Sequence, residues 1–240
     1  MKISARDWTK YIRRLSAINS AAAKRMQSWM VANGLGDSEA MIAYAYALTT
    51  RYGEAAASLA CEMYDAVAAA QGVAAAPAEP AAIATYAETA RAVMGTMRNQ
   101  RNTVPATVGR LVKQAGADTT LQNAARDGAQ FAWVPHGDTC AFCIMLASNG
   151  WQRMSKKAIR GGHAEHIHAN CDCEYSIRFS DSGGVEGYDP AKYLELYENA
   201  EGGTWQDKVN SMRRDQYAAD PEKYRAQKRA AYAARKEEHL

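Results

Sequence analysis

The chain has no run of about 18 consecutive apolar residues, so the sequence predicts no membrane-spanning helix. Its first fifteen residues include basic side chains but lack the apolar segment of a secretory signal. The chain has only three phenylalanines, and its net charge of +3 is too small to indicate a nucleic-acid partner by itself. Hydrophobic residues still make up 48 %, much of it alanine, which favours closely packed helices. With 240 residues, the chain is expected to form one or two mainly helical domains.

Cysteine is also scarce, and its placement is informative. Four of the five cysteines fall in two clusters, Cys140-x-x-Cys143 and Cys171-x-Cys173, while Cys61 stands alone. Clustered spacing and an odd cysteine favour metal ligation in a reducing compartment over a disulfide framework. Cys61 lies in a predicted helix, where we expect a small core residue.

The two clusters have the ligand spacing of a structural zinc site. Zinc prefers about four nitrogen or sulfur ligands in a tetrahedral arrangement, and a C-x-x-C pair supplies two of them from one tight turn. His168 lies 25 residues after Cys143 and opens the second cluster. We therefore expect zinc on Cys140, Cys143 and His168, with one or both of Cys171 and Cys173. Thiols must ionise to bind, so metal binding and folding would be coupled.

Two long helices are predicted near the N-terminus, from apolar residues at alternating three- and four-residue spacing. The first runs from about Ser4 to Asn33, before two glycines, and Asp37 or Ser38 begins the second. The seams are Trp8, Ile12, Leu15, Asn19, Ala22, Met26 and Trp29, then Met41, Ala45, Leu48, Tyr52, Ala55 and Leu59, and Asn19 is the one polar position of the first. We interpret them as the facing sides of a helical hairpin; the alternative is a coiled coil with a partner.

The rest of the chain alternates between helical and extended patterns. A loop or linker with two prolines is expected at 73–82, and helices at 83–100 and 105–129. From residue 131 short strands are expected around 131, 150–154 and 173–179, with a helical turn after Cys140. A flexible loop at 180–187 precedes helices near 190–200, 204–218 and 221–238.

The resulting fold class is mainly α with a small zinc-stapled α+β subdomain. The expected divisions are a helical hairpin or bundle (1–130), a zinc-binding subdomain (131–180), and a loop with a helical C-terminal tail (181–240).

Five basic residues and no acidic residue lie between positions 91 and 117. They are Arg91, Arg98, Arg101, Arg110 and Lys113. Such a segment can contact phosphate groups without reading base sequence. The alternative is a solvated helix face, since no aromatic residues or glycine-rich cradle accompany it.

Two strings stand out in the region 131–179: Val134-Pro-His-Gly-Asp-Thr-Cys-Ala-Phe-Cys143 with the following Ile144–Gly150, and His168-Ala-Asn-Cys-Asp-Cys173. In these strings the region resembles the Mu F-type minor head (head morphogenesis) proteins of tailed bacteriophages. The resemblance implies a structural virion protein of the capsid interior, present in the host cytoplasm during assembly. The implied partners are the portal protein and the major capsid protein, with packaged DNA as a non-specific contact. The five implied metal ligands are Cys140, Cys143, His168, Cys171 and Cys173.

An enzyme is the alternative. Common signatures such as G-x-S-x-G, the P-loop and H-E-x-x-H are missing from the sequence. His163, Glu165, His166 and His168 nevertheless lie within six residues, with Glu165 as a candidate general base. A zinc ion held mainly by thiolates is a poor Lewis acid, so we expect no enzymatic activity. A zinc-dependent nucleic-acid enzyme or a capsid maturation protease remains the alternative.

Overall fold

The chain folds into helices and a small sheet that gather in two compact units. The computed structural model describes residues 1–100, 103–137, 139–153, 172–226, 228 and 229. The first unit consists of Met1–Gly137 and Trp151–Tyr188, and the second of Asp138–Gly150 and Asp189–Leu240. The chain thus leaves the first unit, contributes one segment to the second, returns, and leaves again. The domain boundaries expected at residues 130 and 180 stay a prediction.

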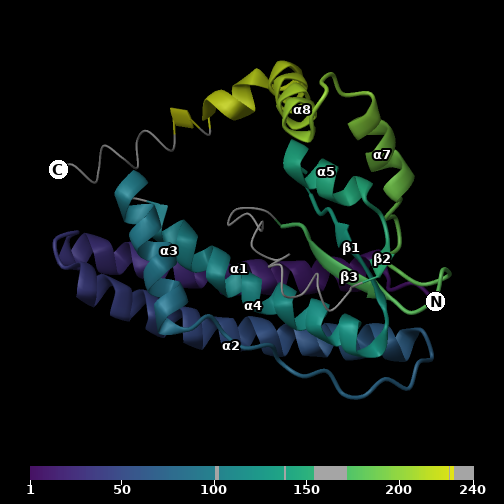
Figure 1. Ribbon diagram of the computed structural model, residues 1–240, viewed down its shortest axis with the longest axis horizontal. Helices are drawn as coiled ribbons and strands as arrows, with labels where there is room; N and C mark the ends of the chain where they lie inside the picture. Colours follow the sequence, from purple (N-terminus) through teal and green to yellow (C-terminus); the bar gives the residue numbers. More distant parts are fainter. Residues whose placement is uncertain (101–102, 138, 154–171, 227, 230–240) are drawn as a thin grey trace. The chain divides into compact units, whose positions relative to one another are not determined.

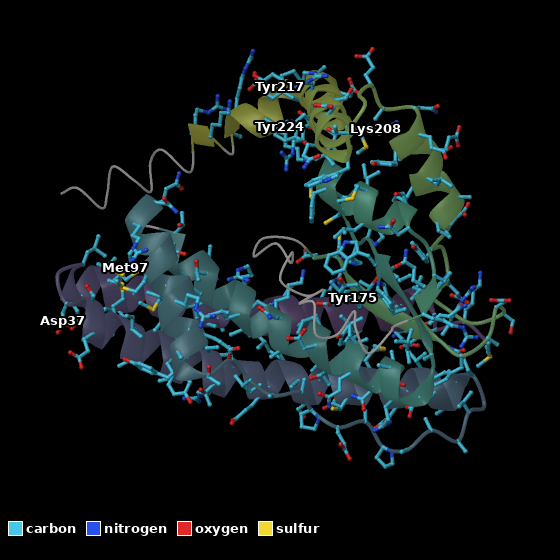
Figure 2. All side chains as sticks on the ribbon, in the orientation of Figure 1. Asp37, Met97, Tyr175, Lys208, Tyr217 and Tyr224 are labelled. Atoms are coloured by element: carbon cyan, nitrogen blue, oxygen red, sulfur yellow. The ribbon has the colours of Figure 1, made fainter. Side chains whose placement is uncertain are left out.

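Four helices dominate the first unit: α1 (Ala5–Asn33), α2 (Ser38–Ala70), α3 (Tyr86–Asn99) and α4 (Val104–Asp127). Their positions confirm the helices expected from the sequence. Local capping explains the agreement. At the start of α1, α2 and α3, a side chain accepts a hydrogen bond from a backbone amide that has no partner within the helix. Ser4 caps α1, Asp37 caps α2 (Figure 2), and Thr85 forms a capping box at α3 with Glu88. The two backbone and side-chain hydrogen bonds from Thr85 lower the pKa of Glu88.

Helix α4 is the centre of the first unit, because it packs against both α1 and α2 (Figure 1). It is buried around most of its circumference, as a helix with neighbours on several sides must be. Gly116 permits the close approach: a Cβ there would lie 3.4 Å from the Ala56 carbonyl oxygen and 3.5 Å from a Leu15 methyl carbon. The expected hairpin of α1 and α2 exists, but the seam between them is shared with α4.

The packing of α4 against α1 and α2 changes which of their residues are buried. Ala55, expected in the seam of α2, is exposed, whereas Gly53, Ala56 and Ala57 are buried. On α1 the seam ends at Met30. The expected seven-residue repeat was therefore wrong at Ala55, whereas Trp29 stacks on Tyr44 of α2 with the ring centres 5.5 Å apart, as expected of a residue that faces α2. A straight helix turns about 20° per heptad away from such a repeat, and small residues follow the side that faces α4.

Residues 73–85 run without helix or strand between α2 and α3, so the loop expected at 73–82 extends three residues further. Side chains of α4 hold this segment, which we call the strap. Asn123 Nδ2 donates to the Glu79 carbonyl at 2.8 Å, and Asn123 Oδ1 accepts from the Glu79 amide at 3.0 Å. Thr119 Oγ1 accepts from the Ala81 amide at 3.0 Å, and Arg126 donates to two strap carbonyls. The strap is thus fixed by polar side chains that replace a strand partner.

Within the described residues the strands form one three-stranded antiparallel sheet in the order β2-β1-β3. The strands are β1 (Gln130–Val134), β2 (Gln152–Arg153) and β3 (Glu174–Arg178). This confirms the three expected strands. The first four residues of β3 are all buried, so β3 is covered on both faces. Its neighbours include α4 and α2.

The segment 180–187, expected to be a flexible loop, is tied to the N-terminus. Ile3 forms a parallel bridge with Val185, through Ile3 N to Gly184 O at 2.8 Å and Glu186 N to Ile3 O at 3.0 Å. Both apolar side chains are buried. The N-terminal residues therefore fix a part of the chain that follows the sheet.

The second unit contains α5 (Ala141–Ser148), α7 (Pro190–Glu198) and α8 (Trp205–Ala219), and residues 221–226 are also helical. Helix α5 packs against α7 and α8. The buried cluster consists of Ala141, Ile144, Ala200, Val209 and Met212. Lys208 (Figure 2) closes the end of α7, because its Nζ donates to the carbonyls of Tyr197, Glu198 and Ala200 at 2.9–3.1 Å. None of the described helices is both long enough and apolar enough to cross a membrane.

Candidate metal centre

The C-x-x-C pair begins helix α5 in the second unit. Cys140 is the N-cap residue and Cys143 the third residue of the helix. The Cys140 side chain makes no capping hydrogen bond at the start of the helix. Side chains at these two positions lie on the same side of the first turn, as the reciprocal contacts of a capping box show. Cys143 is 1 % exposed and Cys140 is half-buried.

This pair suits a soft metal ion. Thiolates are favoured at a helix N-terminus, where the unsatisfied amides carry partial positive charge. Ligands of this type select zinc among the common ions of proteins. The chemistry of the pair therefore fits half of a zinc site.

The second cluster is described in part. Cys173 lies directly before β3 in the first unit and is fully buried. His168 and Cys171 lie outside the described residues, as do His163, Glu165 and His166. In the portion of the chain that the structure describes, no three His, Cys, Asp or Glu side chains form a group able to hold a metal ion. The full ligand set, and the choice between Cys171 and Cys173, stay predictions.

His136 is a nitrogen donor outside the expected ligand set. It follows β1, four residues before Cys140 in the sequence, and is half-buried. Its Nδ1 is buried and makes no hydrogen bond to any described residue. An imidazole nitrogen in that condition is a ligand type that zinc accepts. The sequence offered one signal, a histidine close to the C-x-x-C pair.

Lys113 does not have the role that its charge suggested. It is 2 % exposed in the middle of α4, so it is not available to a phosphate group at the surface. Its Nζ donates to the carbonyl oxygen of Cys173 at 2.7 Å and lies 5.4 Å from the centre of the Trp133 ring. A buried ammonium is costly unless it is paired in this way. The expectation that Lys113 contacts nucleic acid is therefore corrected: it contacts the cysteine-containing segment.

A buried carboxylate follows Cys173, and sequence reasoning missed it. Glu174 has no exposed surface, and its Oε1 accepts a hydrogen bond from the Tyr175 amide at 2.9 Å. Tyr11 on α1 is buried as well, and burial, followed by the Glu174 charge, raises its pKa well above the usual value. Nothing in the neighbouring sequence signals that helices cover this residue.

The other four basic residues of the 91–117 segment differ in exposure or lie outside the described residues. Arg91 and Arg98 are exposed on α3, and Arg101 lies outside the described residues. Arg110 is half-buried on α4 and, with Arg91, lines a cavity of about 610 Å³. Glu88 and Asp118 line the same cavity, so its charge is mixed. The surface is less uniformly basic than the sequence suggested, because acidic residues from outside the segment fold into it.

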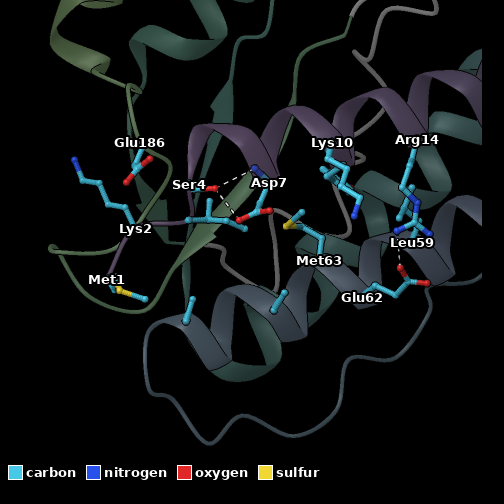
Figure 3. A pocket seen from close by; sticks show the side chains of 14 residues that line it. Met1, Lys2, Ser4, Asp7, Lys10, Arg14, Leu59, Glu62, Met63 and Glu186 are labelled. Carbon is cyan, nitrogen blue, oxygen red and sulfur yellow. Dashed lines mark hydrogen bonds and ion pairs between the residues drawn. The ribbon is translucent and has the colours of Figure 1, made fainter.

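A second cavity, of about 520 Å³, lies between the start of α1 and the end of α2 (Figure 3). Its floor includes Leu59 and Met63, and charged side chains surround it. Two of them, Arg14 and Glu62, form an exposed ion pair at 2.9 Å. Such a mixed groove carries no set of catalytic groups among the residues that line it.

Comparison with known proteins gives the family. The family model described as "VG15 protein" matches residues 2–200, which is most of the chain. This chain belongs to the VG15 protein family. It is a family of phage gene products, so the chain is a phage protein. No curated protein and no solved structure matches it.

The matched residues run from the N-terminal helices through both cysteine clusters to the end of α7. The match leaves out α8 and the residues after it. The phage origin expected from the resemblance is therefore confirmed at this level.

Proposed function

We propose that this VG15 protein is a minor head protein of a tailed phage, acting at the portal and capsid interior during head assembly. The single observation that carries the proposal is the pair of thiols at the start of α5, within a chain that belongs to a phage family. That pair lies in the stretch whose spacing resembles the Mu F-type minor head proteins. The proposed partners are the portal protein and the major capsid protein.

In this proposal zinc is structural. Cys140 and Cys143 would supply two ligands, and His168 with one or both of Cys171 and Cys173 would supply the rest. When bound, zinc contributes folding free energy by joining segments that are distant in sequence. The surrounding residues keep water away from the sulfurs, as the burial of Cys143 and Cys173 indicates. A rigid element of this kind presents a surface to a partner without a large apolar core.

Contact with packaged DNA is a subordinate part of the proposal. Its support is now limited to Arg91 and Arg98, which are exposed on α3, and to Arg110 in the wall of the adjoining cavity. Arg101 remains a candidate outside the described residues. Contacts of this kind would bind phosphates without base specificity and would weaken as salt increases.

The test is complementation of a phage from which this gene has been removed. A plasmid would supply the parent chain, Cys143→Ser, or the matched control Cys61→Ser. Cys61 is a half-buried thiol of α2 in the first unit, and burial raises its pKa. The parent and Cys61→Ser are expected to restore plaques and to appear in purified virions by mass spectrometry, with about one zinc per chain. Cys143→Ser is expected to lose zinc and plaques.

Two results would contradict the proposal. If virions assembled with the parent lacked the chain, it would not be a head protein. If the parent carried no zinc, or Cys143→Ser kept it, the metal would not bind at this pair. The enzymatic alternative has its own signature: a DNA or capsid-protein hydrolysis that Glu165→Gln abolishes while zinc content and fold are retained.

A further inference from the structure

The solvent face of α1 carries a row of basic side chains. The row, which we call the α1 basic stripe, consists of four exposed residues, Arg6, Lys10, Arg13 and Lys24. At 3.6 residues per turn, these positions lie within about 60° of one another around the helix axis and span about 27 Å along it. The buried residues of α1 lie on the opposite side of the helix. The stripe is therefore a straight array of positive charge on a helix that the core holds in place.

The charge of the stripe is not neutralised by the acidic side chains beside it. Asp7 bonds instead to the N-cap serine of α1, at 2.7 Å. Glu62 pairs with Arg14 at 2.9 Å, which lies outside the stripe (Figure 3). Glu186 accepts a hydrogen bond from the Ala5 amide at 3.2 Å. No member of the stripe forms an ion pair with any residue that the structure describes.

The surroundings of the stripe favour phosphate groups over a protein or a membrane. Between Arg6 and Lys24, a fully described stretch, α1 exposes no large apolar side chain of the kind found at the centre of protein interfaces. A helix on a membrane surface inserts its apolar face, whereas that of α1 is buried against α2 and α4. Single strands are held largely by aromatic side chains on which bases stack, and the stripe contains no aromatic residue.

We propose that the α1 basic stripe binds the phosphate backbone of duplex DNA without reading its base sequence. Duplex DNA carries one negative charge per about 1.7 Å of its axis, so a stripe of about 27 Å can lie beside about eight base pairs. The proposal goes beyond the DNA contact of the proposed function, which concerns α3 and α4. It rests on the proposed function only in taking packaged DNA as the duplex that the chain meets.

The experiment measures binding of the full chain to a fluorescent duplex of about 20 base pairs, by anisotropy at several salt concentrations. Arg6→Gln with Arg13→Gln removes two charges of the stripe and keeps good helix formers at exposed positions. Loss of two phosphate contacts is expected to reduce the slope of log affinity against log salt by about 2. At 0.1 M salt, affinity is expected to fall about 10-fold or more.

Two further pairs separate the stripe from net charge and from side-chain shape. Lys192→Gln on α7 with Arg214→Gln on α8 removes the same charge at exposed positions of the second unit, and is expected to bind DNA as the parent does. Arg6→Lys with Arg13→Lys keeps the charge and is also expected to bind as the parent does, because lysine serves phosphate as a point charge. Circular dichroism melting curves would show that all three pairs fold.

Each result supports or overturns the proposal. Equal weakening in the stripe pair and the second-unit pair overturns it, because binding would then follow net charge. A parent that binds no duplex, or that binds single strands, poly-glutamate or phosphatidylserine vesicles more tightly, overturns it as well. Unequal affinity for two duplexes of different sequence would contradict backbone recognition. Zinc content and incorporation into virions test the proposed function separately, so its failure is distinguishable from failure here.

Discussion

The strap of residues 73–85 is held largely by side chains of one helix, and this makes its stability predictable. Asn123 is 1 % exposed, and it pairs with both the amide and the carbonyl of Glu79. Replacing Asn123 by alanine removes both bonds; the third bond of this side chain, from Nδ2 to Thr119 O at 2.8 Å, stays within α4 and adds little. Each bond to Glu79 is worth about 1 kcal/mol, and the exposed Glu79 backbone can turn to water, so the expected loss is about 2 kcal/mol. For a domain of this size that corresponds to a lower melting temperature by about 4–8 °C.

Calorimetry and amide hydrogen exchange would check this prediction. Exchange at the Glu79 amide should accelerate strongly in Asn123→Ala, because the group that accepts its hydrogen is removed. Asn33→Ala is the control: the Asn33 side chain donates to Trp29 O at the exposed end of α1, where loss of a bond costs less than about 0.5 kcal/mol. The reasoning would be refuted if both variants melted within about 1 °C of each other, or if the Glu79 amide exchanged in the parent as fast as in an unfolded peptide.

Two further outcomes follow from single side chains. Lys208→Met removes the donor to three carbonyls at the end of α7, so it should cost about 2 kcal/mol and speed amide exchange in residues 197–200; unchanged exchange there would contradict it. Hydrogen bonding from the Arg126 side chain lowers the pKa of Asp127 below its ordinary value of 3.8. The stability from this contact is present above about pH 4 and is lost as pH falls through the lowered pKa, so Asp127→Asn should flatten the acid side of a stability–pH curve; equal acid sensitivity in both chains would contradict it.

Local interactions explain why the helices could be predicted. Ser4, Asp37 and Asp189 each accept a bond from an amide within three residues, so the start of each helix is fixed by its own neighbourhood. Apolar spacing then gave the length of α1 and α2. The same spacing failed at Ala55, because the side that is buried depends on α4, which is distant in sequence.

The candidate metal centre was likewise predictable only in its local features. The sequence showed the spacing of its cysteines, and the start of α5 at Cys140 agrees with the expected turn. The sequence did not show which residues surround the cysteines. Glu174 carries a charge, and only the helices packed on β3 show that it is buried.

The sequence by itself determined the helices, the three short strands, the clustered thiols and, through the family that it matches, the phage origin. These depend on neighbours along the chain, on spacing, or on similarity of the whole sequence. Only the tertiary structure decided that α4 is central and that α5 packs with α7 and α8. It also decided that Lys113 bonds to Cys173 instead of facing solvent. Charge in a sequence does not state exposure, because burial is set by segments that meet only when the chain folds.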